Sequence, residues 1–388
     1  MPVRSLESLR EAPARAKARS ESPLVWDLFV RIFHWSLVAA VSVALVTGLV
    51  LPRNWIALHL AGGTLAIALV AARVAWGFLG PTYARFSAFV RAPREVLHHL
   101  RESADGHARR HRGHNPLGGI MIVGLMATVA ALAVTGTIAL GGALKSGPLA
   151  FVTTNAAGEA FGAIHEVLAN VLLVLIGLHV AGAIYESLRS RENLVAAMID
   201  GRKEARPGDV IPPPAQARPA RAVSTVVVLL AVTAAGVVLM SGRPGLGVAR
   251  GALDPAYASA CGDCHVAYHP SLLPAPTWEA MFDGLARHFG ENATLEEDEA
   301  RQIRAYVLAN SAEAFDTRAA NRLRQTNPSE PLKITATRFW RRVHGGIDDA
   351  TFAAKPVGSR GNCNACHADA AAGTFHPSQI HIPEGGAK

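Results

Sequence analysis

The chain has 388 residues, of which 50% are hydrophobic and 18% charged, and its apolar residues lie in long clusters, which excludes an ordinary soluble enzyme. The net charge of +8 does not indicate a nucleic-acid partner, because the residues from Asp254 onward hold 13 Lys and Arg against 16 Asp and Glu. The remainder therefore carries +11, mostly in short loops between apolar segments, which is the charge pattern of a membrane protein.

The first 23 residues are polar and basic, and they predict a tail at 1–23 that is not a removed signal peptide. Five apolar segments follow, each long enough to cross a bilayer as a helix. They lie at 24–51, 55–76, 117–140, 160–185 and 223–240. The Pro-rich run 201–222 predicts an extended linker before the fifth segment, which contains neither a charge nor a histidine.

The loop charges predict the orientation of these spans. The tail has five Lys and Arg, and the loops 77–115 and 188–222 have seven each. The two opposite loops have one each, Arg53 and Lys145. The positive-inside rule therefore places the tail and both long loops in the cytoplasm, and five spans then place everything after residue 240 in the periplasm.

Residues 254–388 have the composition of a small, mainly helical and loop-rich domain without a strand pattern. Amphipathic periodicity predicts helices at 278–289 and 295–310. Thr294 with Glu297 three residues later predicts a capping box for the second helix. The large apolar residues are so few that we expect a thin core unless a large cofactor fills it.

All four cysteines occur in two copies of the pattern C-x-x-C-H, which is the attachment motif of c-type haem. The copies are Cys261-Gly-Asp-Cys264-His265 and Cys363-Asn-Ala-Cys366-His367. Both thiols of a copy can form thioethers, and the adjacent histidine can bind the iron. A thioredoxin-like pair is the alternative, but no βαβ pattern surrounds either copy, and the strict adjacency of the histidine disfavours a structural zinc site.

Each haem c also needs a sixth ligand or an open site, and five histidines are candidates: His269, His288, His344, His376 and His381. His269 follows His265 by four residues on the proximal side, so it cannot bind the same iron from the opposite face. His376 and His381 lie in the last segment, where surface positions are the default. We therefore favour His288 and His344.

Four histidines lie inside the apolar spans, where ionisable groups are costly and rare. His165 and His179 are 14 residues apart on the fourth span, nearly four helical turns or about 21 Å, and so share roughly one face. The topology places His34 at the depth of His179 and His59 at the depth of His165. This predicts two bis-histidine haem b sites; the alternative is buried, hydrogen-bonded histidines.

Small and cationic residues near these histidines suggest room and charge for a cofactor. Glycines that could lower the helix surface for a flat ring, or simply allow helices to pack, are Gly62, Gly63, Gly177 and Gly182. Arg31 and Arg73 could pair with haem propionates, or their side chains could extend to the membrane surface.

A cytoplasmic loop contains five more histidines: His98, His99, His107, His111 and His114. A metal-binding tract is conceivable. Because arginines are interspersed, we favour a solvated basic loop that contacts anionic lipid headgroups. The sequence contains no phosphate-binding loop, dinucleotide-binding fingerprint or nucleophilic triad motif.

The motifs RIFHW, HLAGG, ARVAWGFLGP, GHNPLGG and IHEVLANVLLVLIGLHVAGAIYES resemble the bacterial cytochrome b561 family, close to the cytochrome b subunits of Ni/Fe hydrogenases. The resemblance covers 24–200. It implies a transmembrane four-helix bundle with two b haems, whose axial histidines correspond to His34, His59, His165 and His179.

Residues 254–385 resemble the periplasmic dihaem cytochrome c family, through ACGDCH, RHFGE, FWRRVHGG and NCNACH. This resemblance implies His265 and His367 as proximal ligands and favours His288 and His344 as distal ligands. Here the two types are fused, with the fifth span as the joint.

The sequence thus predicts an all-α, multi-pass protein of the bacterial inner membrane, with a b561-like domain at 24–200, a fifth helix at 223–240 and a periplasmic domain at 254–388. We expect two haem b and two covalently bound haem c, which transfer electrons in a respiratory chain between quinone and a periplasmic redox protein. The expected partners are membrane lipid, quinone and that protein, and no nucleic acid.

Two alternatives share these cofactors. One is a periplasm-facing oxidoreductase, for example of the superoxide:quinone type. The other is a cytochrome b docking subunit of a hydrogenase-like complex. Whether the chain acts as an enzyme, such as a quinol:cytochrome c-type oxidoreductase, is left open by the sequence.

Overall fold

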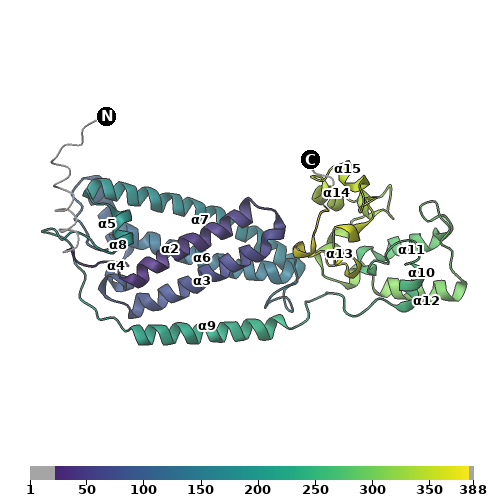
Figure 1. The fold of residues 1–388 in the computed structure, drawn as a ribbon, viewed down its shortest axis with the longest axis horizontal. Coiled ribbons are helices and arrows are strands. Elements are labelled where there is room, and N and C mark those ends of the chain that lie inside the picture. The colour runs from purple at the N-terminus through teal and green to yellow at the C-terminus, as the bar shows by residue number, and fades with distance from the viewer. Residues whose placement is uncertain (1–21, 384–388) are drawn as a thin grey trace. The chain divides into compact units, whose positions relative to one another are not determined.

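The computed structural model describes residues 22–383, and within this range all regular secondary structure is helical (Figure 1). No strand forms among the described residues, whose β-type pairing is limited to four isolated bridges. This confirms the all-α prediction. The described chain divides into two compact units, the first made of 22–50, 58–134 and 165–235 and the second of 51–57, 135–164 and 236–383.

Within residues 22–383, five helices are long and apolar enough to cross a membrane. They are α2 (Leu28–Leu49), α3 (Ile56–Leu79, preceded by η1 at Arg53–Trp55), α6 (Pro116–Ala143), α7 (Asn155–Ser190) and α9 (Pro219–Ser241). Each contains the central part of one predicted span. The helix α9 begins four residues before the predicted fifth span, and α7 extends five residues past each end of the predicted fourth span.

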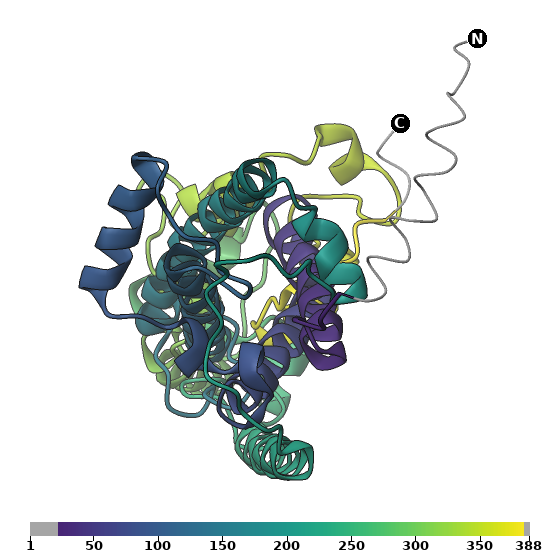
Figure 2. The same cartoon turned by 90° about the vertical axis from the view of Figure 1, so that its left-hand side faces the viewer.

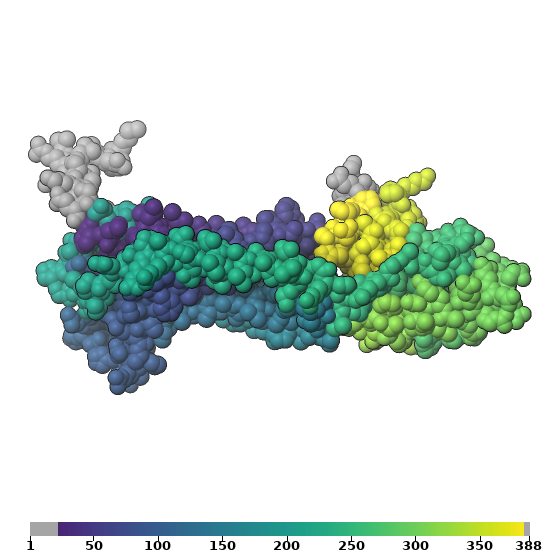
Figure 3. All heavy atoms as spheres, turned by 90° about the horizontal axis from the view of Figure 1, so that it is seen from below, coloured from purple at the N-terminus to yellow at the C-terminus, as the bar shows by residue number. Residues whose placement is uncertain are grey.

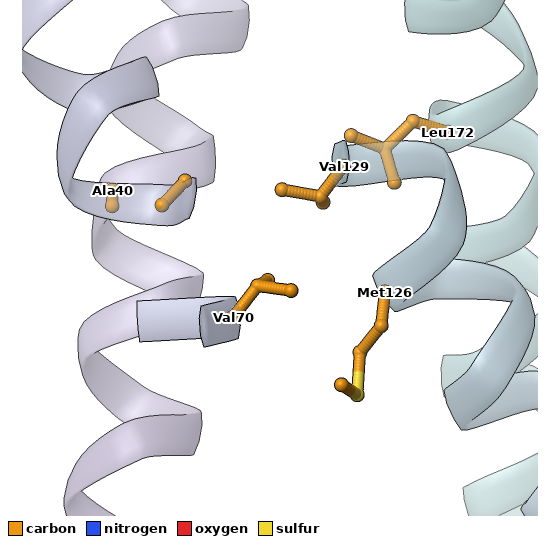
Figure 4. Packing of buried hydrophobic residues seen from close by; sticks show 6 residues of the cluster. Ala40, Val70, Met126, Val129 and Leu172 are labelled. Carbon is orange, nitrogen blue, oxygen red and sulfur yellow. The ribbon is translucent and has the colours of Figure 1, made fainter. Parts of the chain in front are cut away.

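The helices α2, α3, α6 and α7 form a bundle whose core lies in the first unit. Its buried residues come from all four helices: Ala40, Ala66, Val70, Met126, Val129 and Leu172 (Figure 4). By contrast, α9 lies outside this bundle (Figures 1 and 2), and no residue in its most apolar window is buried. Figure 3 shows its surface uncovered along its length. An apolar helix with no protein cover is the form expected of a span that faces lipid.

Side-chain caps fix where the bundle helices begin. The carboxylate of Asp27 accepts the Val30 amide at 3.0 Å and so caps α2, and its other oxygen accepts Trp76 Nε1 of α3 at 3.0 Å. Asn115 Oδ1 accepts the Gly118 amide at 2.7 Å at the start of α6, as the Asn-Pro signal indicates.

Short elements cover one end of the bundle in the first unit: η2 (Thr82–Ala84), α4 (Phe86–Phe89), α5 (Pro93–Ala104) and α8 (Leu194–Asp200). The prediction of a solvated basic loop is wrong for part of this region. His99 is 4% exposed, and its ring contacts His111 at 5.4 Å between centroids. Arg110 donates to Asp209 at 2.6 Å and to Glu192 at 2.9 Å, so partners distant in sequence turn the loop inward.

The second unit holds many short helices and irregular segments. They are α10 (Pro255–Ala260), η3 (Pro270–Leu272), α11 (Ala275–Asp283), η4 (Leu285–Arg287), α12 (Glu297–Ala309), η5 (Ala312–Ala314), α13 (Arg318–Leu323), η6 (Ile334–Ala336), α14 (Arg338–His344), α15 (Asp349–Ala353), η7 (Cys363–Ala365), η8 (Ala370–Ala372) and η9 (Pro377–Gln379). Its buried apolar residues form three small clusters, around Ile303, Leu272 and Trp340. The expected thin core is therefore what this unit has.

Two local predictions in this unit are wrong. The helix predicted at 278–289 ends at Asp283, because Gly284 caps it, and His288 then lies in extended backbone. The capping box also fails: α12 begins at Glu297 without a side-chain cap, and Thr294 bonds Asn292 Oδ1 instead, at 2.6 Å through its hydroxyl. A nearby asparagine thus competes for the group that the motif assigns to the helix.

Candidate haem sites

One pair of imidazoles lies in the first unit between α2 and α7. The ring centroids of His34 and His179 are 6.4 Å apart and the planes are inclined by 49°. His34 Nδ1 is buried without a hydrogen-bond partner. The structure therefore brings together the two histidines that the topology places at one depth.

The second pair lies between α3 and α7, also in the first unit. The centroids of His59 and His165 are 6.0 Å apart at 72°. Each Nδ1 faces a backbone carbonyl, Ala44 O at 2.9 Å for His59 and Leu132 O at 3.0 Å for His165. A ring whose Nδ1–H donates to a carbonyl presents Nε2 as the free lone pair, which is the usual arrangement of a metal-bound histidine.

Sequence reasoning missed Gly48, which makes room for this second pair. A Cβ at Gly48 would lie 3.0 Å from His59 Cε1, tighter than ordinary contact. Gly62, one of the glycines that the sequence suggested, packs closely against α2. A Cβ at Gly62 would lie 3.0 Å from the Ala40 carbonyl oxygen, so close helix packing explains the glycine. Gly177 and Gly182 would meet nothing within 4 Å, which leaves open space beside His179.

Two further pairs lie in the second unit beside the cysteine motifs. His265 and His288 have centroids 6.3 Å apart, inclined by 36°. His344 and His367 have centroids 6.1 Å apart, inclined by 72°. Burial lowers the pKa of His288, His344 and His367, so these rings stay neutral at physiological pH, which is the form that binds a metal.

All four separations match the spacing of two imidazoles on opposite faces of one metal ion. An imidazole nitrogen bonds a transition metal at about 2.0–2.1 Å, and about 1.1 Å more from nitrogen to ring centre on each side gives about 6.3 Å. The observed values run from 6.0 to 6.4 Å. The four pairs thus fit four bis-histidine haems.

The surroundings of the second cysteine motif fit a large flat ring. Trp340 stacks on His344 at 4.3 Å and its carbonyl lies 2.9 Å from His344 Nδ1, which orients the ring. A cavity of about 370 Å³ opens beside these two residues and Arg360. No disulfide joins Cys261, Cys264, Cys363 and Cys366, so disulfide pairing does not compete with attachment of a haem.

Tyr268 connects the two cysteine motifs, which sequence reasoning did not predict. Its ring lies 6.3 Å from that of His265, inclined by 17°. Its hydroxyl accepts the amide of Cys363 at 3.2 Å and donates to Gly361 O at 3.3 Å. One side chain therefore contacts the histidine of the first motif and holds the backbone of the second.

The remaining candidate ligands have local structural roles. His269 is 8% exposed, and its Nδ1 accepts the Ser271 amide at 3.1 Å, which begins η3. His376 caps η9 in the same way through Ser378. His381 is exposed, and its amide bonds the Cys366 carbonyl at 2.8 Å. The structure does not bring any of these three rings against His265 or His367.

Among the described residues, no group of three or more His, Cys, Asp or Glu side chains is placed to hold a metal ion, and this includes the five histidines at 98–114. Arg73 is 3% exposed, so its side chain is enclosed by the protein and not open to solvent or lipid. Arg31 donates to the Ile199 carbonyl at 2.7 Å.

Comparison with known proteins divides the chain in two. Residues 25–201 match the family model of prokaryotic cytochrome b561, and residues 257–375 match that of dihaem cytochrome c. A probable Ni/Fe-hydrogenase B-type cytochrome subunit of Bradyrhizobium diazoefficiens is 26% identical over 219 residues, which cover 47% of this chain and 86% of that protein.

Solved structures that resemble the chain are dihaem cytochromes. The DHC purified from Rhodobacter sphaeroides is 33% identical, with 31% of this chain and 96% of that chain covered and a TM-score of 0.26. The diheme cytochrome type c of Shewanella baltica OS155 is 32% identical, with 34% and 94% covered and a TM-score of 0.28. Because both TM-scores are below 0.5, we draw no conclusion about the fold from them.

The expected family resemblances are therefore confirmed by the two family matches. The domains they identify are those of haem b and haem c proteins, and the five apolar helices are those of a membrane protein. Residues 25–201 match the prokaryotic cytochrome b561 family and residues 257–375 match the dihaem cytochrome c family, and these two domains together are those of a membrane electron-transfer cytochrome.

Proposed function

We propose that this protein transfers electrons between the quinone pool and a periplasmic redox protein through two b haems and two c haems. The axial ligands are His34 with His179 and His59 with His165 for the b haems. For the c haems they are His265 with His288 and His367 with His344. The thioethers form at Cys261, Cys264, Cys363 and Cys366.

The observation that carries this proposal is the common separation of the four pairs, 6.0–6.4 Å between ring centroids. Two pairs come from apolar helices and two lie beside C-x-x-C-H motifs, so the pairs sort into the two haem types by their surroundings. A haem supplies a reversible one-electron couple when it is bound. The chain holds the rings in place, excludes water and sets the local charge.

Specific residues perform these tasks. The backbone carbonyls of Ala44 and Leu132 hold His59 and His165 through Nδ1, which fixes the ring orientation and increases ligand basicity. The buried layer around Val70, Met126 and Leu172 keeps water out of the bundle. A low-dielectric surrounding of this kind and the axial ligand type are two of the levers that determine a haem potential.

Loop charge supports an inner-membrane protein whose N-terminus is cytoplasmic and whose residues 254–388 are periplasmic, since the tail and two long loops hold nineteen Lys and Arg against two on the other side. The apolar, protein-free surface of α9 supports contact with lipid. With a quinol as donor and a periplasmic cytochrome as acceptor, the activity would be that of a quinol:cytochrome c oxidoreductase.

Haem counting tests the assignment. The purified full-length protein should give b and c haem in a 1:1 ratio by pyridine haemochrome. His59→Leu should lower the ratio to 1:2, because one non-covalent haem loses a ligand, and His107→Leu at an exposed loop position should leave it unchanged. A His59→Leu variant with both b haems, or a wild-type protein with c haem only, would contradict the membrane half of the proposal.

Electron transfer is tested by stopped-flow mixing of the oxidised protein with a quinol. Both the b-type and the c-type absorption bands should change to their reduced forms. Reduction of the b bands alone would exclude a relay to the periplasm. Binding of CO to the reduced protein would indicate an open site and favour the periplasm-facing oxidoreductase; the paired histidines lead us to expect none.

A second candidate function is that of a docking subunit for a hydrogenase-like enzyme. It is favoured by the likeness to the hydrogenase B-type cytochrome subunit, which covers 86% of that protein. Co-purification of a hydrogenase subunit with the tagged protein from native membranes would support it. Quinol-driven c-haem reduction at full rate in the isolated chain would show that no such partner is required.

A further inference from the structure

Arg73 on α3 is a buried arginine that forms no salt bridge with the described residues, although the charge of Asp27 acts on it from a greater distance. It is 3% exposed, and its Nη1 has no hydrogen-bond partner. Its guanidinium lies over the rings of Phe86 and Phe89, 5.6 and 5.8 Å from the ring centroids. These aromatic faces hold the guanidinium plane in place but cannot accept the N–H in its plane.

His114, a half-buried residue just before α6, has a second buried nitrogen in the same region. Its Nδ1 has no hydrogen-bond partner, and its ring lies 5.2 Å from Phe89 and 4.4 Å from Trp26. Burial lowers the pKa of His114 to about 3, helped by the charge of Arg73 and, more weakly, of His179 and His34. His114 is thus neutral, and its ring and the Arg73 guanidinium both lie against Phe89.

The carboxylates around this region are already engaged. Asp27, the carboxylate whose charge acts on Arg73, accepts the Val30 amide with one oxygen and Trp76 Nε1 with the other. Lys203, which also influences His114, pairs with Glu192 at 3.3 Å. A buried cation without an acceptor pays the full cost of leaving water, so the site calls for an anion that these side chains do not supply.

We propose that Arg73 and His114 bind a propionate of the haem b that lies between His34 and His179. This rests on the proposed function, because it needs a haem at that pair. A haem carries two carboxylates at one edge, and a planar guanidinium binds a carboxylate through two parallel N–H groups. The ion pair would neutralise the buried charge of Arg73 and fix the haem edge at the end of the bundle that the loop charges place in the cytoplasm.

The electrostatic consequence is specific to one haem. A positive charge beside a haem stabilises its reduced state, since reduction adds an electron. Removal of the Arg73 charge should therefore lower the midpoint potential of one b haem and leave the other b haem and both c haems as they are. Lys at this position keeps the charge and should restore most of the potential.

The test compares Arg73→Leu, Arg73→Lys and a control, Arg85→Leu, in the purified full-length protein. Arg85 already donates to the Gly80 and Gln216 carbonyls, so its loss removes the same charge without leaving a haem carboxylate unpaired. Spectroelectrochemical titration gives the four potentials, and pyridine haemochrome gives the ratio of b to c haem. We expect a downward shift of one b haem, or loss of one b haem, in Arg73→Leu only.

Three results would overturn the inference. The first is an Arg73→Leu variant with unchanged haem potentials and unchanged haem content. If that variant also oxidises quinol more slowly, Arg73 belongs to a quinone site and not to a haem site. Equal loss of haem in Arg73→Lys would show that charge is not what matters. An equal shift in Arg85→Leu would show a general field effect. If wild-type protein binds no haem b, the proposed function fails instead.

Discussion

Replacement of Asp316 by Asn should open a polar contact within the second unit, which we name the Asp316 clasp: Lys145, Asn155, Gly247 and Asp316. Asp316 Oδ2 accepts Lys145 Nζ and the Asn155 amide, each at 2.8 Å. The Asp316 amide donates to the Gly247 carbonyl at 2.8 Å. The clasp therefore joins the segment between α6 and α7 to the dihaem segment and to the tether after α9.

The magnitude follows from the burial of the two charges. The Lys145 side chain is 7% exposed and that of Asp316 is 31% exposed. Loss of one partner of a buried pair costs about 3–5 kcal/mol, and an exposed pair contributes about 0–1 kcal/mol. For this half-shielded pair we expect about 2 kcal/mol, or about a 30-fold change in the opening equilibrium.

The pKa of Asp316 shows which form of the clasp is stable. Burial works to raise this pKa, but hydrogen bonds from Lys145, Asn155 and Asn321 hold it below its ordinary value. The stabilisation is then present above the ordinary Asp pKa and is lost as the pH falls through the lower, folded-state value. The clasp should hold at neutral pH and open only in acid.

Limited trypsin cleavage after Arg250 in the detergent-solubilised protein measures the opening. Arg250 is exposed, but Gly247 is held by Asp316, and a protease needs several residues on each side in extended form. Asp316→Asn and Lys145→Met should each speed cleavage about 30-fold, and the double variant should be little faster than either.

Asp298→Asn is the matched control, because Asp298 pairs with Arg301 on the surface, where the two side chains are 95% and 69% exposed. It should leave the cleavage rate unchanged. The clasp would be refuted if Asp316→Asn were cleaved at the wild-type rate. It would also be refuted if the double variant were accelerated by the product of the two single effects.

Three further perturbations test other contacts. Tyr268→Phe removes the hydroxyl that holds the second cysteine motif, so the potential of a c haem should shift. The free energy of unfolding should fall by about 1 kcal/mol, which lowers the melting temperature by a few degrees. An unchanged redox titration would contradict this. Burial lowers the pKa of His111 to about 4, so the folded state resists protonation of this ring. The melting temperature should therefore fall as the pH drops from 6.5 toward 4 and stay level above pH 6.5. His111→Gln should flatten this dependence of melting temperature on pH. Gly48→Ala should reduce the haem b content, because the added methyl group would press on His59. Gly236→Ala on α9 is the control, since a Cβ there meets nothing within 4 Å. Equal haem b content in the two variants would show that Gly48 does not make room for the His59 ring.

The long-range order of the membrane part was predictable because it follows from regular geometry. A helix rises by a fixed amount per residue, so length and apolarity give the spans, and consecutive spans must alternate in direction. Antiparallel spans then pair His34 with His179 and His59 with His165 by depth alone. The structure brings these residues together at 6.4 and 6.0 Å.

Contacts between irregular segments were not predictable in this way. The helix at 278–289 fails at Gly284, and the capping box fails because Asn292 competes for Thr294. His99 becomes buried through contact with His111, and Asp316 meets Lys145 across 171 residues of sequence. Such pairings depend on side-chain shape and hydrogen bonding in three dimensions, and no periodicity in the sequence encodes them.

The haem b and haem c sites differ in the number of residues between their two paired histidines. His265 and His288 are 23 residues apart, and so are His344 and His367, with the motif histidine first in one pair and last in the other. His34 and His179 are 145 residues apart. The free-energy cost of closing a loop of n residues grows as about 1.5 RT ln n. Closing the 145-residue loop therefore costs about 1.6 kcal/mol more than closing a 23-residue loop, without counting the packing of the helices in between.

This difference matches the way each haem would be held. A c site built from a short segment and two covalent bonds can form with little of the fold in place. A b site has no covalent link and depends on helices brought together by the core around Val70, Met126 and Leu172. Destabilising that core, for example by Leu172→Ala at about 2–5 kcal/mol, should therefore release haem b while haem c stays attached. Parallel loss of both haem types would show that the c sites depend on the bundle.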